Sequence, residues 1–409
     1  MKHVIIGVGA AGIAAARTIR QMESDAEIVM ISEDKHVHSR CMLHKYISGE
    51  RDEVTISFVP ENFFEKNRVK WLRGIKVTGV DVGKKEVLTA DGAVSYDKLL
   101  IAAGAESSRM PIAAFDTAKN VCGLRSLDDA KRIKEAAKNV EHIAIIGAGL
   151  VGMDAAYALL ELGKKVTVIE IGTRILPLNL DEKAEEDYHA RFETAGCNFS
   201  FGHKVSNAVV DSAGNITGLK MDDGSVIHCD FVVVAAGARP AVGFLKDSGI
   251  LVDGVVEVHR NMSTGTRDVY AAGDIVANLS GIWANAVEHG RIAARNMCDD
   301  PAIYTHFFAT KNTINFFGLI TLTLGEVVSK PGDTVHTCHD SRGYRKIVFR
   351  DGTVVGVIIQ GDISGAGFWQ HLVRYGISID DVQKPLRKVS FADFCGLDEK
   401  GEYFYLSRG

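Results

Sequence analysis

One segment of the chain, HSRCMLHKYISG at residues 38–49, places a thiol among basic side chains. Cys41 follows Arg40 and precedes Lys45, with three histidines close by. Positive charge stabilises a thiolate, so Cys41 could act as a redox thiol. It could instead be a small apolar residue beside a working site. We favour the second interpretation, because Arg40 and Lys45 are better explained by the chemistry considered below. No metal is expected, since the histidines lack a further ligand at usable spacing.

Glycines near the N-terminus have the spacing of a dinucleotide loop. VIIGVGAAGIAAARTI runs from a β-branched stretch through Gly7, Gly9 and Gly12 into an alanine-rich helical stretch. The first glycine makes the turn, the second lets the backbone meet a pyrophosphate, and the third packs helix on strand. Ala10 and Ala11 would open the helix, whose N-terminus attracts phosphate. Glu33 ends the next predicted strand, 21 residues past Gly12, where a carboxylate can bind ribose hydroxyls.

The same unit recurs 140 residues later. HIAIIGAGLVGMDAAYALLELG carries Gly149 and Gly152 with Leu150 and Val151 between them, and the following strand KVTVIE ends on Glu170. Two complete strand–turn–helix–strand–acid units predict two bound dinucleotides. Glu170 favours NADH over NADPH, because an acid at that place would repel a 2′-phosphate.

Three further motifs follow these units in the sequence. Apolar strands end on Ala-Ala-Gly twice, giving Ala103 and Gly104 in the first case and Gly237 in the second. STGTRDVYAAGDI then presents Gly273 and Asp274 before GIWANAVEHG, which is predicted to begin a tightly packed helix.

On these motifs, GVGAAG, GAGLVG, AAGARP and YAAGD, the chain resembles the pyridine nucleotide–disulfide oxidoreductase superfamily over about residues 1 to 300. The resemblance implies an α/β fold of two Rossmann-like, glutathione-reductase-like domains plus a C-terminal α+β domain. Residues 1–110 and 240–305 would bind FAD, 111–239 would bind NAD, and 306–409 would form an interface-like domain with a hairpin at Asp351-Gly352 and a helix containing Trp369. It also implies that Asp274 contacts the flavin ribityl chain and that Val77 meets the adenine.

The resemblance extends to a particular branch. SEDKHVHSRCMLHKYISG is similar to the motif of NADH:rubredoxin oxidoreductases, nitrite reductase flavin subunits and ferredoxin reductases, with Cys41 in place of the usual proline. In that branch the counterpart of Lys45 is a cation that pairs with an acid at the place of Asp154 and stabilises charge on the flavin. WANAVEHG similarly places Trp283 near the flavin edge. Electrons from NADH would then pass through FAD to rubredoxin, a ferredoxin-like protein or an iron–sulfur subunit.

Other chemistries remain open. CMLHKYISG is also similar to the single-cysteine motif of CoA-disulfide or persulfide reductases and NADH oxidases, which would make Cys41 a redox thiol. The true disulfide reductases are excluded, because their second cysteine is missing. Peroxidases and oxidases carry a histidine proton donor where this chain has Ala10. A flavin-bound NADH sensor is a third class.

Bulk properties agree with a multidomain cytoplasmic enzyme. The chain has 409 residues and a net charge of −5, which offers no bulk attraction to nucleic acid or to an anionic membrane. Its seven cysteines are scattered, with 31 residues between the closest two, as in reduced cytosolic proteins. The longest apolar stretch is interrupted by charges and glycines, so no membrane span is expected. A homodimer through the last domain and a free last domain are both open.

Overall fold

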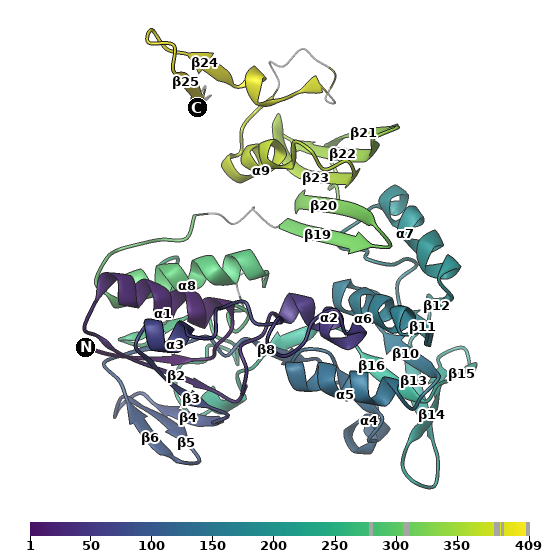
Figure 1. Cartoon of the computed structure of the whole chain (residues 1–409), viewed down its shortest axis with the longest axis horizontal. Helices are drawn as coiled ribbons and strands as arrows, with labels where there is room; N and C mark the ends of the chain where they lie inside the picture. The colour runs from purple at the N-terminus through teal and green to yellow at the C-terminus, as the bar shows by residue number, and fades with distance from the viewer. Residues whose placement is uncertain (278–280, 306–310, 380–384, 386–387, 406–409) are drawn as a thin grey trace. The chain divides into compact units, whose positions relative to one another are not determined.

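The computed structural model of the chain describes residues 1–277, 281–305, 311–379, 385 and 388–405. The chain divides into two compact units. Unit 1 comprises Met1–Thr173 and Gly196–Thr305, and unit 2 comprises Arg174–Ala195 and His306–Gly409. Both glycine-rich loops lie in unit 1, and each belongs to a parallel sheet of its own (Figure 1).

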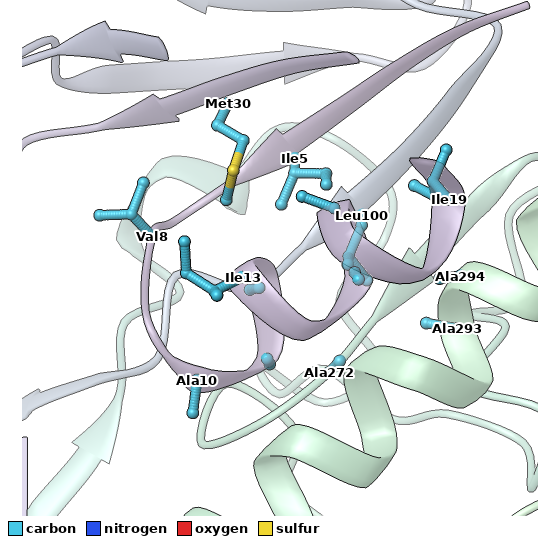
Figure 2. Packing of buried hydrophobic residues seen from close by; sticks show 14 of the residues in the cluster. Ile5, Val8, Ala10, Ile13, Ile19, Met30, Leu100, Ala272, Ala293 and Ala294 are labelled. Carbon is cyan, nitrogen blue, oxygen red and sulfur yellow. The ribbon is translucent and has the colours of Figure 1, made fainter. Parts of the chain in front are cut away.

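The first parallel sheet is built around the strand that precedes Gly7. Its five strands, in spatial order, are β18 (Val269–Ala271), β7 (Lys98–Ile101), β1 (Lys2–Ile6), β2 (Glu27–Ser32) and β3 (Val69–Arg73). Because side chains alternate between the faces of a strand, Ile5, Met30 and Leu100 pack with helices α1 (Ala10–Met22) and α8 (Trp283–Met297), as Figure 2 shows in part. Val4 and Leu99 belong to the core on the other face. An antiparallel sheet covers that face with β4 (Val77–Asp81), β5 (Glu86–Thr89) and β6 (Gly92–Ser95).

Helices α1 and α8 approach closely because they meet at small residues. A Cβ built on Gly290 would overlap the backbone carbonyl of Ala11. One built on Gly273 would lie 3.2 Å from the Cβ of Ala11. Ala293 and Ala294 of α8 are fully buried in the same cluster (Figure 2). This packing fixes the first turn of α1, which follows the glycine loop.

The second parallel sheet repeats the arrangement around Gly147. Its strands are β12 (Cys197–Phe201), β11 (Lys165–Glu170), β10 (His142–Ile146), β16 (Phe231–Val234) and β9 (Val121–Gly123). The helices of this part are α4 (Ala113–Thr117), α5 (Leu127–Ala137) and α6 (Leu150–Glu161). A second antiparallel sheet shares its hydrophobic core and consists of β13 (Val205–Val210), β14 (Ile216–Met221) and β15 (Val226–His228). Where the chain passes between the two parallel sheets, β8 (Ala105–Ser107) pairs with β17 (Ala238–Pro240).

Short elements complete unit 1. They are the 3-10 turns η1 (Arg40–Met42) and η2 (Gly243–Leu245) and the helices α2 (Leu43–Ser48) and α3 (Phe63–Lys66). Helix α2 packs against both α5 and α6, so the segment that holds Cys41 borders the second parallel sheet's helices.

Unit 2 is an antiparallel sheet with helices. The sheet has the order β19 (Lys311–Phe316), β20 (Leu319–Gly325), β23 (Thr353–Gly361), β22 (Gly343–Arg350) and β21 (Thr334–Asp340), and the further elements are α9 (Ala366–Tyr375), η4 (Phe391–Asp393), β24 (Cys395–Leu397) and β25 (Tyr403–Tyr405). The predicted turn at Asp351-Gly352 is confirmed, with φ of +49° and +72°. The predicted helix around Trp369 is also confirmed, and this ring is buried against the sheet.

The predicted fold class is confirmed, since two parallel α/β sheets and a separate antiparallel sheet are present. Each parallel sheet draws its strands from one of the ranges predicted for a dinucleotide-binding domain. Helix α7 (Glu182–Thr194), which lies inside the range predicted for the NAD-binding domain, packs instead in unit 2. There the hydroxyl of Tyr188 donates to Thr321 Oγ1 at 2.9 Å. The division into three domains stays a prediction.

Candidate active site

The loop after β1 leaves the start of α1 open to an anion. Gly7 has a φ of +106°, and a Cβ on it would overlap the backbone carbonyl of Ala102. Gly9 is the N-cap of α1 and makes no side-chain cap hydrogen bond; a Cβ built on it would have no atom within 4 Å. Buried Ala10 and Ala11 form the first turn. The first N–H groups of a helix have no partner within the helix, and together with the helix dipole they fit the pyrophosphate of a dinucleotide.

Gly12 supplies the third part of the motif. A Cβ on Gly12 would overlap the carbonyl oxygen of Gly7, so only glycine lets α1 lie this close to the loop. The end of the Met30 side chain, from β2, would lie 3.2 Å from the same Cβ. The predicted roles of the three glycines therefore agree with the backbone geometry.

The second loop has the same shape. Gly147 also has a φ of +106°, and a Cβ on Gly152 would overlap its carbonyl. Gly149 is the N-cap of α6, again without a side-chain cap, and has open space where a Cβ would stand. Leu150 and Val151 form the first turn, and Val151 is 40% exposed. A second dinucleotide phosphate fits here for the same reasons.

Glu170 ends β11 beside this second loop. Its carboxylate accepts hydrogen bonds from the backbone N–H groups of Ala148 and Gly172, both at 2.8 Å. The negative charge is therefore held next to the loop, where it disfavours a 2′-phosphate. Arg174, a basic residue four positions after Glu170 in sequence, donates to two backbone carbonyls of its own segment at 2.6 and 3.2 Å. Both observations agree with the preference for NADH.

The remaining residues predicted to bind cofactor lie mostly at strand ends. Glu33 follows β2 and is largely exposed, with its carboxylate 3.5 Å from Lys76 Nζ. Val77 is buried at the start of β4, and Ala103 and Gly104 follow β7. Gly237 follows β16 with a φ of +100°, and Gly273 follows β18 with a φ of +78°. Carboxyl ends of parallel strands are where α/β sheets bind ligands.

Asp274 has a partner that the sequence analysis missed. The guanidinium of Arg125 makes an ion pair with the Asp274 carboxylate and donates to the backbone carbonyl of Ala105 at 3.2 Å. Arg125 directly precedes α5, whose N-cap Ser126 forms a capping box with Asp129. The stretch LRSLDDA signals the capping box, but no local pattern in the sequence connects Arg125 with Asp274.

Helix α2 sets the direction of the side chains around Cys41. Leu43 and Ile47, four positions apart, are buried and fix which face of the short helix points inward. Arg40, just before α2, donates to the backbone carbonyl of Arg125 at 2.8 Å and lies 3.6 Å from Asp34. A small pocket results, lined by Arg40, Leu43, His44, Leu124, Arg125, Val151 and Asp154.

Lys45 and Asp154 do not form the predicted ion pair with each other, and each has another partner. Lys45 Nζ lies 2.6 Å from Glu50 Oε1, and Asp154 Oδ2 lies 3.6 Å from His44 Nδ1. Successive helical residues point about 100° apart, so when His44 faces α6 its neighbour must face elsewhere. Asp154 also has a short side chain with little reach. Whether Lys45 and Asp154 serve the flavin stays a prediction.

Burial shifts the pKa values of both Asp154 and His44. The Asp154 carboxyl is 28% exposed but is surrounded by protein at the floor of the pocket, and desolvation raises its pKa to about 8. Desolvation, with a smaller contribution from Lys45, lowers the pKa of His44 to about 4. Near pH 7 the pair is therefore predominantly uncharged, and the fixed positive charges that line the pocket are those of Arg40 and Arg125.

Cys41 lies in an environment that disfavours its thiolate. It is an exposed residue, yet protein atoms crowd its sulfur, and desolvation followed by the carboxylates of Asp154 and Asp274 raises the pKa of its thiol. Arg125 acts in the opposite direction but does not outweigh these effects. Whether Cys41 acts as a redox thiol stays a prediction.

Trp283 opens helix α8, as expected. Its ring stands edge-on to Phe58, with the centroids 4.8 Å apart. Farther along α8, His289 is 1% exposed, and burial lowers its pKa to about 4. Its ring packs against Tyr304 with the centroids 4.7 Å apart, so this histidine is a neutral core residue.

The fold and the site define a two-dinucleotide oxidoreductase that uses FAD and NAD(P)H. Its marks are two parallel sheets with duplicated glycine loops, an acid at the end of each second strand, and a charged pocket. The chain belongs to the pyridine nucleotide-disulphide oxidoreductase family, whose model matches residues 1–290.

The chain is also similar to proteins whose names state an activity. The chain is 28% identical over 386 residues to the NADH-dependent phenylglyoxylate dehydrogenase subunit epsilon of Aromatoleum evansii, with 91% of each chain covered. It is 29% identical over 310 residues to the rubredoxin-NAD(+) reductase of Ectopseudomonas oleovorans, covering 73% of this chain and 80% of the relative. A solved ferredoxin reductase from Rhodopseudomonas palustris, serving the CYP199A2 system, shares the fold with a TM-score of 0.84 at 22% identity, covering 92% of this chain and 95% of that one.

Within the described residues, no helix combines the length and the apolar character that a membrane crossing requires.

Proposed function

We propose that this protein oxidises NADH and passes the electrons one at a time to a small redox protein, such as rubredoxin, a ferredoxin-like protein or an iron–sulfur subunit. Bound FAD would accept the hydride and return single electrons, a conversion that a nicotinamide cannot perform. The full-length similarity to a dehydrogenase subunit named NADH-dependent, and the similarity to a rubredoxin reductase, support this assignment.

Different residues of the chain would bind FAD and NADH. The loop at Gly7 to Gly12 would hold the FAD pyrophosphate on α1, and Arg125 with Asp274 would hold the part of FAD nearer the flavin. The loop at Gly149 to Gly152 and Glu170 would hold NADH. Trp283 would cover the flavin edge, which a protein acceptor must approach.

The residues of the pocket would govern charge during hydride transfer. Arg40 and Arg125 supply positive charge, which favours the negative charge that arrives with a hydride. A protonated Asp154 adds no opposing charge below a pH of about 8. Lys45, paired with Glu50 at the surface of α2, would contribute at longer range.

The choice of electron acceptor depends on the similarity to a rubredoxin reductase, and the environment of Cys41 supports it. A redox thiol must be deprotonated to attack a disulfide or persulfide, and its environment raises the pKa of the Cys41 thiol. A thiol enzyme would need the opposite shift. Cys41 is better explained as a small residue beside the flavin, and transfer to a protein carrier does not need it.

The test compares Cys41→Ser with the wild-type holoenzyme. We expect the variant to keep at least half of the wild-type rate of NADH-dependent rubredoxin or [2Fe–2S] ferredoxin reduction, read from the acceptor's own absorbance. Cys122→Ser, a buried cysteine of β9, controls for general effects of losing a sulfur. If instead Cys41→Ser alone abolishes turnover with CoA disulfide or a persulfide that the wild type reduces rapidly, the protein is a thiol-dependent reductase.

Two further assignments belong to this proposal. The chain would work in the cytoplasm, which the seven free cysteines support. A homodimer through unit 2 stays a prediction, which sedimentation of the holoenzyme would decide.

A further inference from the structure

Three side chains that could bind a metal meet at the end of unit 1 remote from the glycine loop. His3 comes from β1, Glu23 is the C-cap residue of α1, and Cys298 is the C-cap residue of α8. Their ligand atoms all lie within 4.8 Å of one another, and His3 Nε2 is 3.0 Å from Glu23 Oε2. Because α1 has 13 residues, this cluster lies about 20 Å from the phosphate-binding end of that helix. It is not part of the cofactor site.

The cluster is largely shielded from water. His3 is fully buried, the Glu23 side chain is 26% exposed, and Cys298 is partly buried. His3 Nε2 faces the Glu23 carboxylate, and a neutral imidazole nitrogen has a lone pair that can bind a metal. A bound cation would stabilise the Cys298 thiolate.

The local field also favours a cation. The C-terminal ends of α1 and α8 converge on the cluster, and each carries the partial negative charge of a helix C-terminus. The ammonium group of Lys98 is paired with Asp299 at 2.6 Å. A thiolate and the Glu23 carboxylate together would balance a divalent ion, so no net charge would be left in this partly buried place.

We propose that His3 Nε2, Cys298 Sγ and one carboxylate oxygen of Glu23 bind a Zn²⁺ ion, with water as the fourth ligand. Mixed nitrogen, sulfur and oxygen donors are typical of zinc, whereas magnesium and calcium take oxygen donors alone. Bond lengths of about 2.0 Å to nitrogen and oxygen and about 2.3 Å to sulfur could be reached by small side-chain movements, because the three ligand atoms already lie within 4.8 Å of one another. Binding replaces the thiol proton, which is released to water.

Such an ion would tie the first strand to the ends of the two helices that form the FAD side of unit 1. It would thereby reinforce the close packing of α8 on α1 that fixes the first turn after Gly9. The role is structural, and NADH oxidation by the loaded enzyme does not depend on the ion directly.

Cobalt titration tests the site in the FAD-loaded protein after treatment with a chelator. We expect one equivalent of Co²⁺ per chain to produce tetrahedral d–d absorption at wavelengths longer than those absorbed by oxidised flavin, and Zn²⁺ to displace it. Cys298→Ser should lose this absorption, whereas Cys338→Ser, a partly exposed cysteine of β21, should retain it. Zn²⁺ should also raise the melting temperature of the wild type and not of Cys298→Ser.

Glu23→Gln provides a second variant, because the Glu23 side chain is partly exposed and its loss is easier for the fold to accommodate. We expect the same loss of the cobalt spectrum, with the FAD content unchanged. No tetrahedral spectrum in the wild type, or an unchanged spectrum in both Cys298→Ser and Glu23→Gln, would show that the cluster is only a hydrogen-bonded triad. Either result would overturn the proposal.

Discussion

At the scale of single residues, the site is governed by which side chains lose contact with water. Asp154 and His44 face each other at 3.6 Å in the pocket, and burial pushes their pKa values toward the uncharged forms. Lys45, one position away, stays near the surface with Glu50. The charge balance of the pocket therefore depends on Asp154 and on two arginines rather than on a lysine–aspartate pair.

Asp154→Asn should change how stability depends on pH. The folded-state pKa of Asp154 is raised to about 8, so the folded protein binds more protons than the unfolded chain from about pH 4 to 8, and stability falls as pH rises through this range. His44 has a lowered pKa and acts oppositely, but only below 6.5. From pH 6.5 to 8 the wild type should lose up to about 2 kcal/mol that Asp154→Asn retains.

Melting temperatures of the holoproteins at these two pH values measure this difference. Asp91→Asn, at an exposed position, should behave like the wild type. An equal pH dependence in Asp154→Asn and the wild type would mean that the carboxyl titrates normally.

Arg125→Gln should weaken FAD binding. The variant removes an ion pair with Asp274 and leaves that carboxylate without its charged partner, a change of about 1.5–3 kcal/mol that corresponds to roughly ten- to hundredfold in Kd. Arg132→Gln is the matched control, because this exposed arginine of α5 donates to the backbone carbonyls of Lys119 and Val121. Fluorescence titration of the apoproteins with FAD would check the prediction, and equal Kd values for the two variants would contradict it.

At the scale of elements, the packing of α8 on α1 determines how the first loop is held. Both helices place small residues at this contact, and a Cβ built on Gly290 would overlap the backbone of Ala11 (Figure 2 shows the neighbouring part of this contact). A loop that binds pyrophosphate through its backbone depends on the position of the helix behind it.

Gly290→Ala should therefore separate the helices. The added methyl group would overlap the Ala11 carbonyl, and relief of such overpacking costs roughly 1–3 kcal/mol. We expect a lower melting temperature and weaker FAD retention on gel filtration. Gly243→Ala in η2, where a Cβ would meet no atom within 4 Å, should leave both unchanged. Full FAD retention by Gly290→Ala would show that the loop does not depend on this contact.

The sequence was sufficient to predict elements whose signals are local. Glycine spacing predicted both loops, because each of the three positions has its own backbone constraint, and the Asp351-Gly352 pair predicted the hairpin. Side-chain direction was harder to predict. His44 faces Asp154 because buried Leu43 and Ile47 set the rotation of α2, and a six-residue helix gives too short a pattern to reveal that rotation.

At the scale of the whole molecule, two features could not be read from the sequence. Arg125 reaches Asp274, 149 positions away, through a contact between distant parts of the chain. Helix α7 follows the second acid in sequence but packs in unit 2, where Tyr188 bonds to β20 residues. Neither contact has a local pattern, because each depends on how complete elements fold back on one another.

The central claim is that electrons leave through the flavin without a redox thiol. Anaerobic titration of the holoenzyme with NADH, followed by flavin absorbance, tests it most directly. We predict that a single equivalent of NADH per flavin completes bleaching, with identical spectra for the wild type and Cys41→Ser. A wild type that consumes a second equivalent and develops a long-wavelength thiolate–flavin charge-transfer band, absent from Cys41→Ser, would contradict the account.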